Sequence, residues 1–421
     1  MARILPFKGL LYNPDKVSGN EVIAPPYDVI SPDYKEALYR KSPYNIVRID
    51  FGKELPGDNE SVNRYSRSRD LLAQWEQEGV LSRDSEPAFY AYEADYELRG
   101  KRKRLRGFLG LVKLEELGKG VYPHEATHAK PKEDRLNLMR WCHANISPIY
   151  ALYNSPEHGT AALLEEAAAG RPYFSAEDLD GAEHRLYRIA DPAKIELITR
   201  ELCDKHIFIA DGHHRYEVAL EFKREMDRRE QSASPGERSA EASRPWDYVL
   251  MFLANMADEG VSILPTHRMV KGIADKSAVL EKLAPDFAVS RAPLDADIAG
   301  LLSGESGHAF GLYLDTEQQL YVLNYREDHL QDVPPALREL DVVILHELIL
   351  KRDLGITEVA FEMDAKEALR RVRNGDFDGV FFLNPTGVGD VERVALSNLR
   401  MPPKSTYFYP KLLTGMVIYR F

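Results

Sequence analysis

The stretch HIFIADGHHRYEVAL, residues 206–220, leaves the backbone few alternatives. It opens with a short apolar run of the kind that forms a buried strand. Asp211-Gly212 is typical of a tight turn, and from His213 onward apolar side chains recur at helical spacing. The pattern therefore predicts a strand, a turn and a helix in direct succession, as expected of a mixed α/β protein.

The turn itself predicts an anion-binding site. Backbone N–H groups at a helix start point outward unpaired, and the helix dipole adds positive potential there. Gly212 would let a ligand approach the backbone closely, Arg215 can fork onto phosphate oxygens, and His213 or His214 adds a donor or a proton carrier. A second interpretation stays open, in which Asp211 caps the helix and the histidines face solvent.

Composition narrows the classes of partner. The chain has 421 residues and a net charge of −12, from 55 basic and 67 acidic residues, which argues against nonspecific binding to nucleic acid or to an anionic membrane. No apolar run approaches the roughly 18 residues of a membrane span, and the N-terminus lacks the apolar core of a secretory signal. Cys142 and Cys203 form no C-x-x-C pair, so we expect reduced thiols and a cytoplasmic protein.

Several other segments carry patterns of regular structure. We expect helices over 61–81 and 342–355, a hairpin of strands 88–97 and 104–114 with the basic run 99–106 at its tip, and strands at 248–256, 261–270 and 378–385. The polar segment 228–245 is rich in Ser and carries Pro and Gly, so we expect a mobile surface loop there.

His124, Glu125 and His128 fit the zinc-hydrolase pattern H-E-x-x-H. That pattern is informative only on a helix, where both histidines face one metal and the glutamate sits beside its bound water. Pro123 and Pro131 bracket the motif, and the second proline disfavours helical geometry in the residue before it. Any helix through the motif should therefore be about two turns long, and zinc hydrolysis is kept as an alternative function.

Near the C-terminus, Lys404, Ser405 and Thr406 supply one ammonium and two hydroxyl groups after a stiff Pro402-Pro403 turn. These groups suit a phosphate or carboxylate contact. An alternative stays open, in which this segment is a loop packed by its own tyrosines.

Three further residues are candidates of the same kind. Asp28, in the rigid turn APPYDVIS, offers a carboxylate, although an Asx turn would explain it equally well. His267 and Arg268 in LPTHR could donate to phosphate or could simply pack.

Asp-Gly-His-His-Arg followed by a helix resembles the phosphate-binding signature of the ParB/sulfiredoxin superfamily, which includes nucleotide-using ParB proteins, sulfiredoxins and free-serine kinases. The whole chain resembles a bacterial and archaeal family of unknown function, number 1015. The matching segments run nearly from end to end: PFKGLLYNPDKV, APPYDVIS, SPYNIVRID, PHEATHAKPKEDRLNL, ANISPIYALY, ADGHHRYEVAL, LPTHRMV and MPPKSTYFYPKLLTG.

The resemblance implies a mixed α/β fold with a ParB/sulfiredoxin-like core. We expect an N-terminal α/β region over 1–118, the core over 119–275 and a C-terminal α/β region over 276–421. It also implies a nucleotide-dependent phosphotransferase acting on a small hydroxylated metabolite, with free serine or phosphoserine suggested and transfer possible in either direction. ATP or ADP with Mg²⁺ would be the cofactors.

The resemblance also assigns roles to residues. The segment Asp211–Arg215 would hold the donor phosphates, with His213 and His214 also placed at the reacting group. Glu125 would accept the proton of the substrate hydroxyl. Asp211 and Glu133 are the candidate magnesium ligands, and Glu133 and Asp134 are both rivals for the role of base or magnesium ligand.

Three alternative functions remain at this point: a phosphoserine phosphatase-like hydrolase, a non-catalytic nucleotide-binding protein of the ParB kind, and the zinc hydrolase. The acceptor, the donor nucleotide, the direction of transfer and the oligomeric state stay open.

Overall fold

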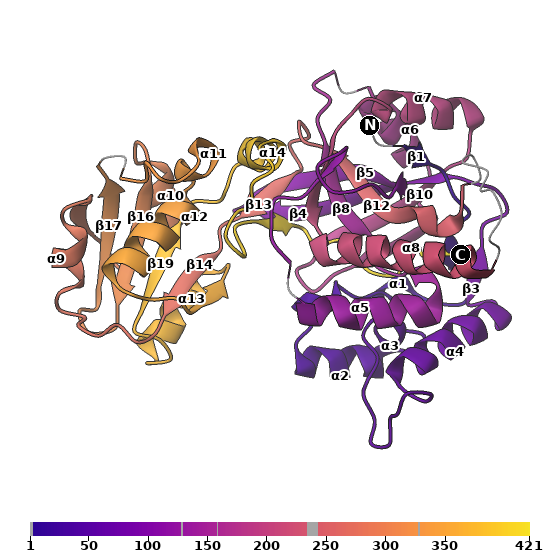
Figure 1. Ribbon diagram of the computed structural model, residues 1–421, viewed down its shortest axis with the longest axis horizontal. Helices are drawn as coiled ribbons and strands as arrows, with labels where there is room; N and C mark the ends of the chain where they lie inside the picture. The colour runs from indigo at the N-terminus through magenta and orange to yellow at the C-terminus, as the bar shows by residue number, and fades with distance from the viewer. Residues whose placement is uncertain (1–2, 128, 158, 234–242, 327–328) are drawn as a thin grey trace. The chain divides into compact units, whose positions relative to one another are not determined.

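The computed structural model describes residues 3–127, 129–157, 159–233, 243–326 and 329–421 (Figure 1). The chain forms two compact units, which are described separately. The first unit comprises Met1–Pro123, Thr127–Ser262 and Pro410–Phe421, and the second comprises His124–Ala126 and Ile263–Tyr409.

The first unit is built on a mixed sheet with the strand order β6-β11-β8-β12-β5-β4-β10-β9, and β1 pairs with β5 outside this path. Its strands are β1 (Ile4–Leu5), β4 (Phe89–Leu98), β5 (Lys101–Lys113), β6 (Val121–Tyr122), β8 (Ile149–Tyr153), β9 (Phe174–Glu177), β10 (Glu183–Ile189), β11 (Ile207–Asp211) and β12 (Tyr248–Asn255). β11 lies parallel to β6 and antiparallel to β8. Every residue of β12 is buried, as its unbroken apolar run requires.

The helices of the first unit are α1 (Gly19–Val22), α2 (Pro32–Lys41), α3 (Val47–Asp50), α4 (Arg64–Gln77), α5 (Ala129–Cys142), α6 (Ala161–Ala168), α7 (Pro192–Leu202) and α8 (His213–Ala233), with short 3₁₀ turns at Tyr27–Val29 and Pro245–Asp247. Helix α8 buries Tyr216, Ala219 and Phe222 in the core that also contains the sheet residues. Helix α5 packs on α8, and α4 packs on α5 (Figure 1). Two small ribbons complete the unit, β2 (Leu10–Tyr12) with β3 (Leu81–Arg83), and β7 (Ala144–Asn145) with β21 (Tyr419–Arg420).

The second unit has its own antiparallel sheet, with the order β15-β17-β16-β19-β14-β18. The strands of this sheet are β14 (His267–Val270), β15 (Phe287–Ala292), β16 (Ala309–Leu314), β17 (Gln319–Tyr325), β18 (Val359–Glu362) and β19 (Gly379–Leu383). Outside it, β13 (Ser262–Leu264) pairs with β20 (Tyr407–Tyr409). Its helices are α9 (Val279–Leu283), α10 (Ile298–Ser303), α11 (Pro335–Arg338), α12 (Asp341–Ile344), a π-helix at Leu345–Asp353, α13 (Ala365–Arg373) and α14 (Val388–Leu396).

The mixed α/β class is confirmed, and so is most of the local structure. Helix α4, the β4–β5 hairpin, strands β11, β12 and β19, and the helical segment after residue 341 all lie where the sequence predicts them. Three details differ. The segment 261–270 holds two strands, because Pro265 interrupts it. Residues 228–233 of the expected loop instead extend α8, and residues 234–242 lie outside the described residues. The hairpin tip is only Arg99-Gly100, and both residues have positive φ.

The compact units do not follow the expected segments 1–118, 119–275 and 276–421. Strands β4 and β5 from the first segment pair with β10 and β12 from the second, so the two segments share one sheet.

The chain also returns to the first unit for its last residues, Pro410–Phe421, which we call the C-terminal strap. Its end pairs with β7 through β21, and its middle exchanges backbone hydrogen bonds with Leu10 and Ala24. Among the described residues, no helix is both long and apolar enough to cross a membrane.

Candidate functional site

The predicted strand–turn–helix is present in the first unit. Strand β11 ends at Asp211, Gly212 follows with φ +96°, and α8 begins at His213. This backbone conformation favours glycine. A Cβ at Gly212 would lie 2.8 Å from Nε of Arg215, so the close approach that glycine permits is made by the arginine side chain. His213 is buried and His214 is half-buried.

Asp211 is held between two cations. Nζ of Lys411 lies 2.9 Å from Oδ2 of Asp211, and Nη2 of Arg215 lies 3.4 Å from Oδ1. Burial raises the pKa of Asp211, but Lys411 and Arg215 outweigh it and hold that pKa well below its usual range. The carboxylate is therefore ionised at neutral pH, beside two positive groups.

Lys411 is a site residue that the sequence analysis missed. It stands seven residues after Lys404, the lysine that the sequence singled out, within the segment MPPKSTYFYPKLLTG. Its contact with Asp211 depends on the return of the C-terminal strap to the first unit, which no local pattern predicts.

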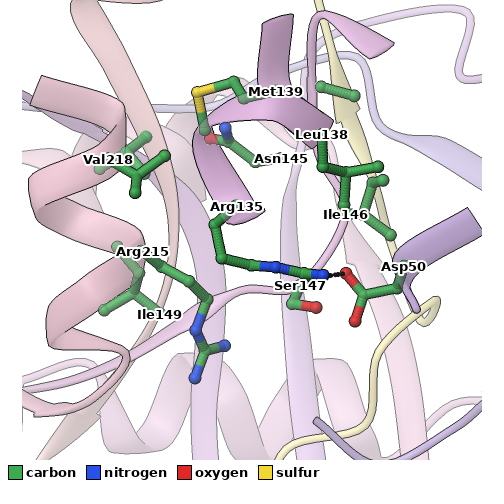
Figure 2. A pocket seen from close by; sticks show the side chains of 12 residues that line it. Asp50, Arg135, Leu138, Met139, Asn145, Ile146, Ser147, Ile149, Arg215 and Val218 are labelled. Carbon is green, nitrogen blue, oxygen red and sulfur yellow. Dashed lines mark hydrogen bonds and ion pairs between the residues drawn. The ribbon is translucent and has the colours of Figure 1, made fainter. Parts of the chain in front are cut away.

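A cavity of about 40 Å³ lies next to the turn in the first unit (Figure 2). It is lined by Asp50, Arg135, Leu138, Met139, Ala144, Asn145, Ile146, Ser147, Ile149, Arg215, Val218 and Val249. Figure 2 shows the Arg135 side chain extending towards Asp50, with Met139, Leu138 and Ile146 above it and Val218 on the side away from Asp50. The cavity is therefore lined both by charged side chains, from Asp50, Arg135 and Arg215, and by apolar ones.

Arg135 is the centre of a buried charge network. Its Nη1 lies 3.0 Å from Oδ1 of Asp50, and its Nη2 lies 2.6 Å from Oδ2 of Asp134. Its guanidinium also stacks 4.0 Å from the ring centroid of Tyr27. Burial raises the pKa of Asp50, with Arg135 opposing the rise, and burial raises the pKa of Tyr27 to about 12.

Two of the predicted candidates, Asp134 and Asp28, lie in or beside this network. Asp134 accepts from Arg64 Nη2 at 2.5 Å as well as from Arg135, so both of its oxygens are engaged in ion pairs. Asp28, in the 3₁₀ turn beside Tyr27, is exposed.

Glu133 is exposed on α5, in a groove between α5 and α8 that it shares with Lys132 and Glu217. In the part of the chain that the structure describes, no group of three or more His, Cys, Asp and Glu side chains is placed to hold a metal ion. The roles of Asp211 and Glu133 as magnesium ligands therefore remain predictions.

The H-E-x-x-H motif does not have the geometry of a zinc site. His124–Ala126 run without helix, and Glu125 makes an isolated bridge with Met401 in the second unit. His124 is fully buried, and its Nε2 lies 2.8 Å from the hydroxyl of Thr406. His128 lies outside the described residues.

Residues 124–127 of the motif form no helix. Helix α5 begins only after it, at Ala129, and Pro131 lies in its first turn. Proline is tolerated there because the N–H groups of a first turn have no partner within the helix.

In the second unit, Glu125 is fixed by a backbone turn. Its Oε1 accepts the N–H of Lys404 at 2.8 Å, and Lys404 has φ +57°. Arg268 holds the same turn from the other side, because its Nη2 donates to the carbonyl of Lys404 at 3.0 Å and to that of Pro403 at 3.4 Å. Arg268 thus acts on Glu125 through the turn.

Arg268 is fully buried, and its Nε donates to Nε2 of His346 at 3.2 Å. Burial lowers the pKa of Arg268 to about 9 and that of His346 to about 4, so the histidine is neutral at pH 7 and can accept this bond. His267 beside it is buried against Phe382.

The hydroxyls of Ser405 and Thr406 have protein partners. Ser405 donates to the carbonyl of Pro402 at 2.6 Å, and Thr406 pairs with His124. The anion-binding role of Lys404, Ser405 and Thr406 therefore remains a prediction. The predicted site residues thus fall into two groups: Asp28, Glu133, Asp134 and Asp211–Arg215 in the first unit, and Glu125, Arg268 and Lys404–Thr406 in the second.

The fold and the site define a mixed α/β protein with a glycine turn at the start of a long helix, surrounded by arginine and lysine side chains. Residues 4–343 match the family model described as "Protein of unknown function (DUF1015)", so the chain belongs to this family. The family resemblance of the sequence is confirmed. The search of curated proteins found no match.

Several solved structures match this chain at low similarity. A conserved hypothetical protein from Pyrococcus furiosus is 14% identical, with 69% of this chain and 88% of that chain covered and a TM-score of 0.33. A free serine kinase in complex with AMP is 15% identical, with 71% and 90% covered and a TM-score of 0.34. SbnI with a C-terminal truncation, from Staphylococcus aureus, is 12% identical, with 73% and 85% covered and a TM-score of 0.34.

Proposed function

We propose that this protein is a nucleotide-dependent phosphotransferase acting on a small hydroxylated metabolite, with free serine or phosphoserine as the first candidates and transfer in either direction. The observation that carries the proposal is the turn at Gly212. It places Arg215 at the start of a 21-residue helix, on the wall of a cavity that also receives Arg135.

The chemistry of phosphoryl transfer matches these groups. Little covalent participation by the protein is needed, but positive groups must surround the moving phosphoryl and a carboxylate must accept the acceptor's proton. Arg215 and the first N–H groups of α8 would bind the donor phosphates, with His213 and His214 beside them and Lys411 balancing Asp211. Glu125, oriented by the Lys404 N–H, is the candidate base.

ATP or ADP with Mg²⁺ would supply the phosphoryl group and neutralise its charge. Mg²⁺ commonly binds through substrate phosphates and one or two carboxylates rather than in an all-protein cage. The described residues, which hold no cluster of metal ligands, fit that arrangement.

Arg215→Ala should weaken ADP or ATP binding by about 10- to 100-fold, because a hydrogen bond between charged partners contributes roughly 1.5–3 kcal/mol. Titration calorimetry with each nucleotide measures this effect. Arg228→Ala, on the same helix but with a largely exposed side chain, is the matched control and should bind normally. Equal affinity in Arg215→Ala and the wild type, or no binding by the wild type, would refute the nucleotide site.

Glu125→Gln should leave nucleotide binding unchanged and slow transfer between serine and the nucleotide by about 100-fold or more, as removal of a general base does. Phosphorus NMR of mixtures containing serine or phosphoserine, ATP or ADP, and Mg²⁺ follows both directions and detects release of free phosphate. Glu367→Gln, which changes a half-exposed glutamate of the second unit that pairs with Arg370, is the control. Nucleotide binding without transfer or phosphate release in any mixture would instead identify a non-catalytic binding protein.

A further inference from the structure

Two buried side chains of the first unit, Tyr92 and His184, and the half-buried Asp178 form a chain of hydrogen bonds that no proposed catalytic step uses. Tyr92 on β4 and His184 on β10 lie on the same face of the sheet, since Tyr92 pairs with Leu186 two residues from His184. The Tyr92 hydroxyl lies 2.7 Å from Nδ1 of His184, and Nε2 of His184 lies 3.1 Å from Oδ2 of Asp178. His184 is fully buried.

The other end of this chain reaches the C-terminal strap. The backbone N–H of Leu413 donates to the Tyr92 hydroxyl at 3.2 Å. Leu413 stands two residues after Lys411, whose ammonium meets Asp211 at 2.9 Å. The three side chains therefore fix the backbone that carries the lysine of the candidate site.

The hydrogen bonds determine where the protons lie. The Tyr92 oxygen accepts from Leu413, and among the described residues the acceptor offered to its single proton is Nδ1 of His184. We assign Nδ1 as the acceptor of this hydrogen bond, which places the proton of the imidazole on Nε2, where it is donated to Asp178. Asp178 accepts this hydrogen bond through its carboxylate. Burial raises the pKa of Asp178, but hydrogen bonds from His184, Ala182 and Asp180 outweigh burial and keep that pKa below its usual value.

We propose that Tyr92, His184 and Asp178 are positioning residues that hold Lys411 against Asp211 and so set the affinity of the Gly212 turn for phosphate. The effect on phosphate rests on the proposed function, whereas the effect on the Lys411–Asp211 pair does not. Loss of any member of the chain leaves buried donors or acceptors unpaired and loosens the backbone at Leu413.

The proton arrangement can be tested directly in the ligand-free protein. Nitrogen NMR of ¹⁵N-histidine-labelled protein should show a proton on Nε2 of His184 and none on Nδ1. Asp178→Asn keeps an oxygen for the two backbone donors but offers an NH₂ group to Nε2, so it should move the proton of His184 to Nδ1. A wild-type His184 protonated on Nδ1 would overturn the proposal.

The link to Lys411 is tested by the titration of Asp211, followed by carboxyl ¹³C NMR without ligand. Lys411→Met should raise the pKa of Asp211, and Tyr92→Phe should raise it in the same direction. Tyr96→Phe is the matched control: it removes a buried hydroxyl from the same strand, one that donates to Gly260, and should leave Asp211 unchanged. An unaltered Asp211 titration in Tyr92→Phe would refute the link.

Binding of ADP then separates positioning from general stability. Tyr92→Phe should weaken ADP binding by about 3- to 10-fold, the effect of one hydrogen bond. In a background of Lys411→Met it should weaken binding no further, because contributions that act through one residue are not additive. Full additivity would refute the positioning role. Absence of ADP binding in the wild type would refute the proposed function, and the titration of Asp211 would then still decide whether Tyr92 positions Lys411.

Discussion

Replacement of Arg135 by methionine should destabilise the first unit by about 3–5 kcal/mol, the usual effect of removing one partner of a buried ion pair. Methionine keeps most of the aliphatic part of the side chain that packs in the cavity. It leaves the Asp50 carboxylate without its cation, and the Asp50 side chain is only 5% exposed. Urea unfolding followed by tryptophan fluorescence measures the loss. The surface pair Arg104–Asp95 gives the control, because Arg104 is nearly half exposed and Arg104→Met should change stability by no more than about 1 kcal/mol.

The deficit should also depend on pH in a defined direction. Burial raises the pKa of Asp50 in the folded protein, and loss of Arg135 removes the charge that opposes this rise. A carboxyl group with a raised folded-state pKa binds more protons folded than unfolded, so the variant loses stability as pH rises above the ordinary aspartate pKa of about 4. The difference from the wild type should therefore be smaller at pH 5 than at pH 7.5. A double variant Asp50→Leu/Arg135→Met should recover much of the loss, and a deficit equal at both pH values would contradict this account.

The sequence predicted the local part of the candidate site because its signals are short-range. An apolar strand, Asp-Gly and a helical repeat determine the turn at Gly212 within fifteen residues, and the structure reproduces it. The arginine that fills the space above Gly212 was identified as well, although its ion pair with Asp211 was not.

The remaining features depend on contacts between distant segments. The Arg135–Asp50 pair joins residues 85 positions apart, and the Lys411–Asp211 pair joins residues 200 apart. No periodic pattern in the sequence predicts either pair. H-E-x-x-H predicts little for the related reason that these letters do not determine the backbone conformation: residues 124–126 pair with the segment around Met401 instead of forming a helix.

Deletion of the C-terminal strap, residues 410–421, should prevent the first unit from folding. The strap belongs to this unit, although in the sequence the second unit separates it from the rest of the unit. Six apolar side chains of the strap are at most 9% exposed: Leu412, Leu413, Met416, Val417, Ile418 and Tyr419. Burial of each contributes roughly 1.5–3 kcal/mol, so their combined loss is comparable with the whole stability of a typical domain, about 5–15 kcal/mol. Val417 also fits directly over Gly9, where a Cβ would come within 2.5 Å of it.

The expected result is a truncated protein without a cooperative thermal transition for the first unit, measured by calorimetry and by hydrogen exchange of β11 and β12. A synthetic peptide of residues 408–421, added in excess, should restore protection of these strands, because the strap contributes side chains and backbone pairing rather than a covalent constraint. Full-length Lys411→Met is the control that separates folding from the site: it keeps the buried strap and should retain the transition while its Asp211 loses a cation. Normal protection of β11 and β12 in the truncated chain would show that the first unit is complete without the strap, and Lys411 could then be no more than a peripheral contact of the turn.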